Sequence, residues 1–229
     1  MKFKAVIFDL DGTLLDTIKD IADSMNAVLL KLGFSPHRTE DYYYFVGEGM
    51  KALCEKVIPP GHKTSELITR CVELMKIEYE RRWFNNTRPY PGIPELLDDL
   101  QKMGIKMAVH SNKPDEFTKL FIHRLFPDVQ FSIVLGEKAG LARKPAPDGA
   151  LYIAEVLKVQ PEETVYLGDS EIDMKTAISA GMYPVGALWG FRTAGELINA
   201  GARRLLKAPL DLLTIDFSDD LCKIGKEAL

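Results

Sequence analysis

Two acidic residues directly follow the first apolar run of the chain. Residues 5–8, Ala-Val-Ile-Phe, predict a buried strand, and Asp9, Leu10, Asp11 and Gly12 come next. Side chains two positions apart on a strand share one face, roughly 6–7 Å from each other. One carboxylate could therefore attack a phosphorus atom while the other handles a proton, and Gly12 would let the backbone turn sharply. The structural alternative is a strand that ends in a solvated turn, where Asp and Gly are ordinary residues.

Further polar residues stand where later strands are expected to end. Ser111 and Asn112 follow one predicted strand, Asp169 and Asp173 follow another, and Lys144 lies in a proline-rich loop before a predicted helix. In open parallel sheets, ligands bind beyond the carboxyl ends of the strands. The sequence therefore predicts that these five side chains meet the two acids of the first strand at one edge of a sheet.

Each of these later residues also has a structural explanation when it is taken alone. Ser111 and Asn112 could cap the helix that follows them, since both residue types are favoured at helix N-termini. Asp169 and Asp173 could be a cap and an acid that interacts favourably with a helix dipole. Lys144 could be an ordinary solvated lysine. Their joint occurrence at successive strand ends favours a shared site.

The elements that must position these residues fall into two parts. From residue 91 onward, short apolar strands alternate with amphipathic helices, which predicts an α/β fold with a Rossmann-like parallel sheet and helices on both faces. The first strand is expected to join this sheet. The predicted strands are residues 3–8, 105–110, 131–135, 164–167 and 183–188.

The segment between the first strand and this alternating region has only helical periodicity. Apolar residues recur at helical spacing across 18–83, and one of the helices is expected to begin behind an N-cap at Ser65. We therefore expect residues 16–85 to form an all-helical domain inserted after the first strand. Residues 1–15 and 86–229 would then form the core domain.

Composition and charge exclude several classes of function. The 229 residues carry a formal charge of −4 with 46% hydrophobic and 27% charged residues, so the chain lacks the basic excess of a nucleic-acid binder. No apolar run approaches the ~20 residues that span a membrane, and the N-terminus is too short for a signal peptide. The cysteines Cys54, Cys71 and Cys222 are scattered and lack metal or nucleophile spacing. We expect a cytoplasmic monomer or homodimer without nucleic-acid or membrane partners.

The polar clusters resemble the motifs of the haloacid dehalogenase superfamily of phosphohydrolases. The resemblance covers nearly the whole chain, and the helical insertion is similar to this family's first type of cap domain. The four motifs occur in the family's order as Asp9-x-Asp11-Gly12-Thr13, Ser111-Asn112, Lys144-Pro145 and Gly168-Asp169-Ser170-x-x-Asp173.

The resemblance implies a reaction and a metal. Asp9 would be the nucleophile and form an aspartyl-phosphate. Asp11 would protonate the leaving alkoxide and then take a proton from the hydrolytic water. Asp9, Asp169 and the backbone carbonyl of Asp11 would bind Mg²⁺, with Asp173 as a further ligand or a water-mediated partner.

The resemblance also implies which residues bind the phosphate. Lys144 would place a positive charge beside the phosphoryl oxygens. Ser111, Asn112 and the backbone N–H groups around Gly12 would hold the same oxygens in the transition state. His110 precedes Ser111 on the predicted strand and should face the other side. We therefore expect His110 to be a core residue and not a catalytic base.

The inserted helical segment is expected to select the substrate. Its Gly47-Glu48-Gly49 loop, the form of the last motif and residues 189–193 are similar to phosphoglycolate phosphatases. On that basis, the loop amides would approach the organic part of a small phosphorylated metabolite, 2-phosphoglycolate being the leading candidate. Glu48 must then point away or bind a cation. The structural alternative is a glycine-rich turn that only begins a helix.

Three other functions stay compatible with the same motifs. A phosphomutase of the β-phosphoglucomutase kind would transfer the aspartyl-phosphate to a second hydroxyl group instead of to water. A pyrophosphatase would act on a different phosphate bond. A non-enzymatic module that binds a phosphate ligand or a protein would need none of the catalytic side chains that are present.

Overall fold

The computed structural model describes residues 3–215 and contains a six-stranded sheet in the order β5-β4-β1-β6-β7-β8. Every pairing between neighbouring strands in it is parallel, which confirms the predicted α/β class. The strands are β1 (Ala5–Phe8), β4 (Lys106–Pro114), β5 (Phe131–Glu137), β6 (Thr164–Gly168), β7 (Tyr183–Ala187) and β8 (Arg204–Leu206).

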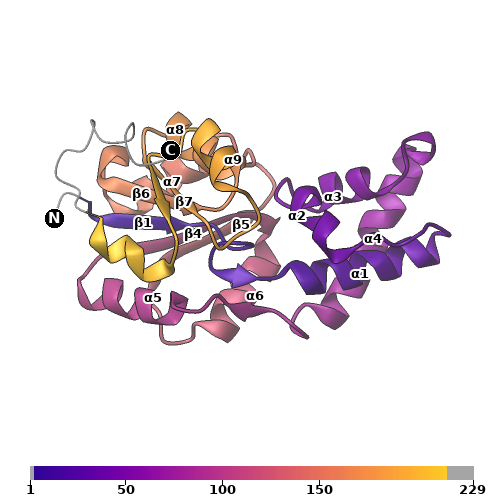
Figure 1. Cartoon of the computed structure of the whole chain (residues 1–229), viewed down its shortest axis with the longest axis horizontal. Coiled ribbons are helices and arrows are strands. Elements are labelled where there is room, and N and C mark those ends of the chain that lie inside the picture. The colour runs from indigo at the N-terminus through magenta and orange to yellow at the C-terminus, as the bar shows by residue number, and fades with distance from the viewer. Residues whose placement is uncertain (1–2, 216–229) are drawn as a thin grey trace.

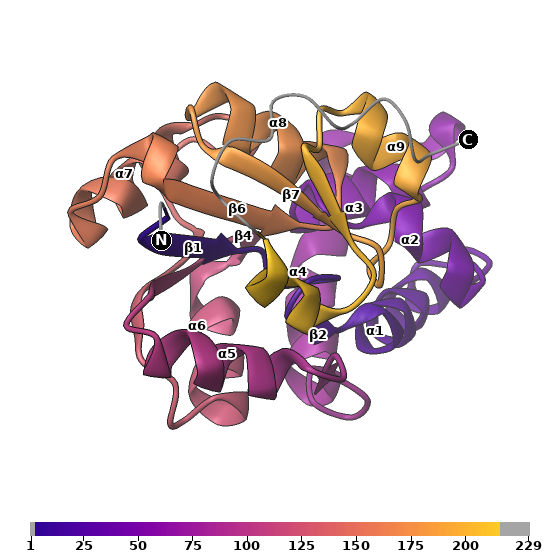
Figure 2. The same cartoon turned by 60° about the vertical axis from the view of Figure 1, so that its left-hand side comes forward.

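Helices cover both faces of this sheet (Figure 2). Val6 and Phe8 of β1 belong to the core that includes α5 and α6, whereas Ala5 and Ile7 pack with α7 and α8. Because side chains alternate along a strand and both faces are covered, all four positions are apolar and buried. The helices are α5 (Ile93–Lys102), α6 (Asp115–Leu125), α7 (Asp148–Leu157), α8 (Glu171–Ser179) and α9 (Ala194–Asn199), with 3₁₀ turns at Pro161–Glu163 and Pro209–Thr214.

A group of helices lies at one end of the molecule, beyond the sheet (Figure 1). A short antiparallel ribbon of β2 (Leu15–Asp16) and β3 (Arg88–Pro89) joins the chain segments that lead into and out of it. The group consists of α1 (Ile18–Lys31), α2 (Tyr42–Phe45), α3 (Met50–Val57) and α4 (Ser65–Arg82), with 3₁₀ turns at Thr39–Asp41 and Pro60–His62. We call residues 18–82 the helical segment.

The boundaries of several elements differ from the sequence prediction. Strand β4 runs to Pro114 because Pro114 pairs with Glu137 across a register shift that follows His110, so the strand includes Ser111 and Asn112. Helix α4 is capped by Thr64 and not by Ser65, since the Thr64 hydroxyl oxygen accepts a hydrogen bond from Leu67 N.

The remaining features are strand β8, the cysteines and the lengths of the helices. Strand β8 was not predicted, because its three residues include only one that is fully buried. Cys54 and Cys71 are buried free thiols in the helical segment, while Cys222 lies outside the described residues. Within residues 3–215, the length and apolarity needed to cross a membrane are not found in any helix.

Candidate active site

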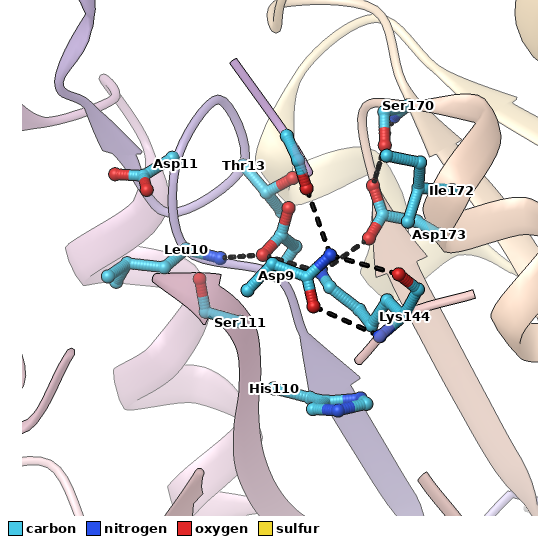
Figure 3. Close-up of polar contacts among 12 residues, drawn as sticks. Asp9, Leu10, Asp11, Thr13, His110, Ser111, Lys144, Ser170, Ile172 and Asp173 are labelled. Atoms are coloured by element: carbon cyan, nitrogen blue, oxygen red, sulfur yellow. Dashed lines mark hydrogen bonds and ion pairs between the residues drawn. The ribbon is translucent and has the colours of Figure 1, made fainter. Parts of the chain in front are cut away.

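The centre of the site is a buried lysine between two carboxylates. Lys144 Nζ lies 2.8 Å from Asp9 Oδ1 and 2.7 Å from Asp173 Oδ1. Asp9 follows β1, Lys144 stands in the loop before α7, and Asp173 lies in the first turn of α8. Figure 3 shows the three side chains pointing toward one another. The predicted convergence of these strand ends is therefore present in the fold.

Asp169 and Asp173 are fixed by neighbouring groups. The Thr13 hydroxyl donates to Asp169 Oδ1 at 3.0 Å, and the Phe191 N–H donates to Asp169 Oδ2 at 2.8 Å. Asp173 Oδ2 accepts hydrogen bonds from the backbone N–H and the hydroxyl of Ser170. These contacts hold both carboxylates in one orientation and close together.

Two glycines allow the backbone to approach Asp169. Gly12 has φ +89°, and a Cβ there would lie 2.3 Å from Asp169 Oδ2. A Cβ on Gly190 would lie 2.2 Å from the Asp169 Cβ. The Gly12 N–H donates to Leu15 O at 2.9 Å, so this amide holds the turn, whereas the sequence analysis expected it at a phosphate.

The acidic cluster could hold a divalent metal ion. Ligand oxygens of Asp9, Asp169 and Asp173 all lie within 4.8 Å of one another, and all three residues are buried. Burial, followed by the charge of Asp173, raises the pKa of Asp9 well above its ordinary value and that of Asp169 to about 7. Crowded buried carboxylates of this kind are stabilised by a hard cation that binds oxygen, which fits Mg²⁺.

Lys144 places a positive charge beside this acidic cluster. Burial alone would lower the pKa of Lys144, but the carboxylates of Asp173 and Asp9 raise it well above its usual value. The ammonium group is therefore charged beside the Asp9 carboxylate. It stands where it could reduce the repulsion between that carboxylate and a phosphate.

The two oxygens of Asp9 differ in their hydrogen bonds. Asp9 Oδ1 accepts hydrogen bonds from the Leu10 N–H at 2.7 Å and contacts Lys144 Nζ. Among residues 3–215, no hydrogen bond reaches Asp9 Oδ2, and Asp9 lines a cavity. A carboxylate that lines a cavity and is held through one oxygen could act as a nucleophile.

Asp11 lies apart from this cluster and pairs with Lys113, a residue that was not predicted to belong to the site. Its carboxylate points away from Asp9 and Lys144 (Figure 3), and Lys113 Nζ lies 3.0 and 3.1 Å from its two oxygens. The predicted strand stopped at residue 110, before Lys113. With β4 continued to Pro114, the alternation of side chains would have placed Lys113 on the same face as Ser111.

Asn112 contacts backbone on both sides of the site. Its Nδ2 donates to Gly47 O and to Lys144 O, each at 3.0 Å, and its Oδ1 accepts from Lys144 N at 3.0 Å. Asn112 therefore joins the helical segment to the loop that carries Lys144. Ser111, the other predicted phosphate contact on β4, lines the cavity beside Asp9 and Asp11.

His110 lies outside this constellation, as expected. It is buried, and its Nδ1 forms a hydrogen bond of 3.0 Å with the hydroxyl of Tyr166. Burial and then the charge of Lys144 lower the pKa of His110 to about 3. A neutral histidine with that pKa does not serve as a base at neutral pH.

The glycine loop of the helical segment lies against the core. Gly47 and Gly49 line the same cavity as Asp9, Asp11 and Ser111, which has a volume of about 60 Å³. Glu48 points away, and its carboxylate pairs with Lys56 at 2.7 Å. Both alternatives predicted for Glu48, an outward orientation and a cation partner, are therefore present.

The fold and this arrangement match a known class of enzyme. Residues 6–187 match the family model of haloacid dehalogenase-like hydrolases, so the chain belongs to that family. It is 33% identical to the phosphoglycolate phosphatase of Aquifex aeolicus over 188 residues, which cover 82% of this chain and 86% of the relative. It is 31% identical to the phosphoglycolate phosphatase of Psychrobacter arcticus, with 86% and 88% of the two chains covered.

Solved structures give the same result. A protein of Lactobacillus delbrueckii subsp. bulgaricus superposes with a TM-score of 0.87 at 35% identity, covering 93% of this chain and 97% of the other. A predicted phosphoglycolate phosphatase of Haemophilus somnus superposes with a TM-score of 0.86 at 25% identity, covering 93% and 98%. The chain is therefore a haloacid dehalogenase-like hydrolase that is similar to phosphoglycolate phosphatases.

Proposed function

We propose that this enzyme hydrolyses 2-phosphoglycolate in a Mg²⁺-dependent reaction through a phosphorylated Asp9. The observation that carries the proposal is the state of Asp9, which lines the cavity and has one oxygen, Oδ1, held by Leu10 and Lys144. Asp9, Asp169 and Asp173 would hold the metal, together with the backbone carbonyl of Asp11. When bound, Mg²⁺ would neutralise phosphate charge and orient the phosphoryl group.

The side chains divide the steps of the reaction. Asp9 attacks the phosphorus atom, and the bond from phosphorus to the ester oxygen breaks as Asp11, after taking up a proton from solvent, donates it to that oxygen. Asp11 then takes a proton from a water molecule that attacks the phosphorus, which releases inorganic phosphate and restores Asp9. Lys144 and Ser111 stabilise the phosphoryl oxygens as charge develops on them.

We further propose that residues 16–85 act as a cap domain over this site. Gly47 and Gly49 of this segment line the cavity together with Asp9, and Asn112 of the core donates to Gly47 O. A closed cap would exclude bulk water while the phosphoryl group moves. A compact substrate such as 2-phosphoglycolate is in keeping with the names of the relatives.

A screen of phosphate monoesters tests the reaction and the substrate together. Purified enzyme with Mg²⁺ is expected to release phosphate from 2-phosphoglycolate with a higher kcat/KM than from glycerol phosphates, sugar phosphates, nucleotides or pyrophosphate. Asp9→Asn and chelation of the metal should each abolish this release. Asp98→Asn, a change at an exposed carboxylate on α5 that pairs with Lys102, is the matched control and should leave it intact.

Two outcomes would contradict the proposal. Phosphate release that survives both Asp9→Asn and chelation would rule out the metal-dependent aspartyl-phosphate. Conversion of glucose 1-phosphate to glucose 6-phosphate without free phosphate would instead identify a mutase.

A further inference from the structure

A second buried lysine, Lys113, lines the cavity. The side chain of Lys113 is only 5% exposed, and its ammonium group contacts both oxygens of Asp11. It lies 4.7 Å from the ring centroid of Tyr79 in the helical segment and 5.1 Å from that of Phe121 in the core. Two aromatic faces and one carboxylate therefore hold this cation in place.

Of the two lysines that line the cavity, Lys113 has fewer carboxylate partners and is the one that could pair with a further anion. Lys113 and Lys144 are the two basic residues among those that line the cavity. Lys144 already contacts Asp9 and Asp173, and both partners belong to the predicted metal and phosphate site. Lys113 has Asp11 as its single carboxylate partner among the described residues. The remaining walls are mainly apolar, with Ile21, Leu53 and Met75 contributed by the helical segment.

An anionic group on the organic part of a substrate would meet a suitable partner only at Lys113. Burial of a carboxylate against these apolar walls is costly unless it is paired and hydrogen-bonded. A neutral organic group would bring no charge to compete with Asp11 for the ammonium group.

We propose that Lys113 binds the carboxylate of the substrate and, in doing so, releases Asp11 to turn toward the leaving oxygen. The inference rests on the proposed function and identifies the substrate class as phosphate esters with a second, carboxylate anion close to the phosphate. Lys113 is then the specificity-determining residue, and its pairing with Asp11 is the state of the site before substrate arrives. With a neutral ester, Lys113 stays on Asp11 and hydrolysis is slow.

The hypothesis is tested by comparing phosphate esters that carry the second anion with esters that lack it. The wild-type enzyme with Mg²⁺ is assayed with 2-phosphoglycolate, its carboxyl methyl ester and ethyl phosphate. The kcat/KM for 2-phosphoglycolate is expected to exceed that for each neutral ester by about 10- to 100-fold, the range of a charge-assisted hydrogen bond. This comparison needs no substitution and therefore does not depend on the folding of a variant.

Substitution of the lysine then locates the recognition. In Lys113→Met, the ratio of kcat/KM between 2-phosphoglycolate and ethyl phosphate should fall by about 10-fold or more, and Lys113→Arg should restore part of it. Lys102→Met, at an exposed position of α5, is the matched control and should keep the wild-type ratio. Circular dichroism and thermal unfolding establish that each variant is folded.

The outcomes separate this inference from the proposed function. A wild-type ratio near one, or a high ratio that Lys113→Met leaves unchanged while both activities fall, overturns the role of Lys113 in recognition. In the latter case the proposed hydrolysis stands and Lys113 only positions Asp11. Absence of activity on every ester overturns the proposed function itself.

Discussion

Asn112 shows how one side chain can connect two parts of a site. Both donors of its amide group are used on carbonyl oxygens, Gly47 O in the helical segment and Lys144 O in the core, and its oxygen accepts from Lys144 N. With these bonds in place the side chain has no N–H group left for a phosphate, which is the role predicted for Asn112 from the sequence. We interpret it as a residue that positions Lys144 when the glycine loop lies against the core.

If Asn112 positions Lys144, a nearly isosteric substitution of Asn112 should lower activity strongly. Asn112→Asp keeps the shape and the acceptor but replaces two donations by repulsion between a carboxylate and two carbonyl oxygens. We expect kcat/KM for the best substrate to fall by about 10- to 100-fold without loss of fold. Steady-state kinetics with circular dichroism provide the measurement, and Asn199→Asp at an exposed position is the control. Wild-type kinetics in Asn112→Asp would refute the assigned role.

His110 predicts how stability depends on pH. Its pKa is lowered to about 3 in the fold, against an ordinary value of 6.5, so the unfolded chain takes up a proton that the folded chain does not. The stabilisation is complete above pH 6.5 and is lost as the pH falls toward 3. His110→Gln removes the titration. From pH 7.5 to 5.5, urea unfolding should therefore show the wild type losing about 1.4 kcal/mol relative to this variant. A constant difference between the two proteins would contradict the shift.

At the scale of elements, the sequence predicted the parts of the fold that have strong periodicity. Strand β1 is apolar on both faces, and its acids stand at its end, so the strand was predicted correctly and its acids became the candidate site residues. Strand β4 was ended four residues early because Ser111, Asn112 and Lys113 are polar, although all three are buried. Ser111 and Asn112 were assigned to the site as residues that follow the strand, but Lys113 beside them was given no role there.

One carboxylate, that of Asp20, links helix α1 to the chain segment that returns from the helical segment. Asp20 is fully buried in the first turn of α1, and it accepts hydrogen bonds of 2.8 to 3.0 Å from the backbone N–H and the side chain of Asn86 and of Thr87. These contacts join residues 66 and 67 positions apart in the sequence. No local pattern distinguishes Asp20 from an ordinary acid near a helix N-terminus, so only the structure identifies it.

Removal of Asp20 should therefore weaken the junction between the two parts of the molecule. Asp20→Ala leaves the N–H groups of Asn86 and Thr87 without their acceptor, and we expect a loss of about 3 kcal/mol in the free energy of unfolding. Asp23→Ala, one turn along the same helix at an exposed ion pair with Lys19, should change it by less than about 0.5 kcal/mol. Equal effects in urea denaturation would contradict the interpretation.

At the scale of the whole molecule, the helical segment and the core meet around the site. Besides the Asn112 bond, Arg143 Nη1 donates to Glu48 O at 3.4 Å, and the rings of Tyr43 and Phe191 stack with centroids 5.5 Å apart. The Phe191 N–H also donates to Asp169. The same short loop therefore touches the helical segment and a predicted metal ligand, which gives metal binding a direct connection to the contact between the two parts.

Metal binding should in turn stabilise the molecule in a way that depends on pH. Burial and Asp173 raise the pKa of Asp169 to about 7 from an ordinary 3.8, so without metal its ionisation makes folding less favourable as the pH rises from 4 toward 7. Mg²⁺ binds the ionised form. Its apparent affinity should therefore fall by roughly tenfold for each pH unit below 7. The carboxylate is mostly ionised at pH 8 and mostly protonated at pH 6.

Thermal unfolding with and without Mg²⁺ measures this coupling. A fixed, subsaturating concentration of Mg²⁺ should raise the Tm of the wild type more at pH 8 than at pH 6, because stabilisation grows with the ratio of metal concentration to Kd. Asp169→Asn should lose most of this increment at both pH values, while Asp98→Asn at an exposed site should keep it. Equal increments at the two pH values would show that the buried acids are already ionised without metal. Lys144, which pairs with Asp9 and Asp173, would then supply enough positive charge for the whole cluster.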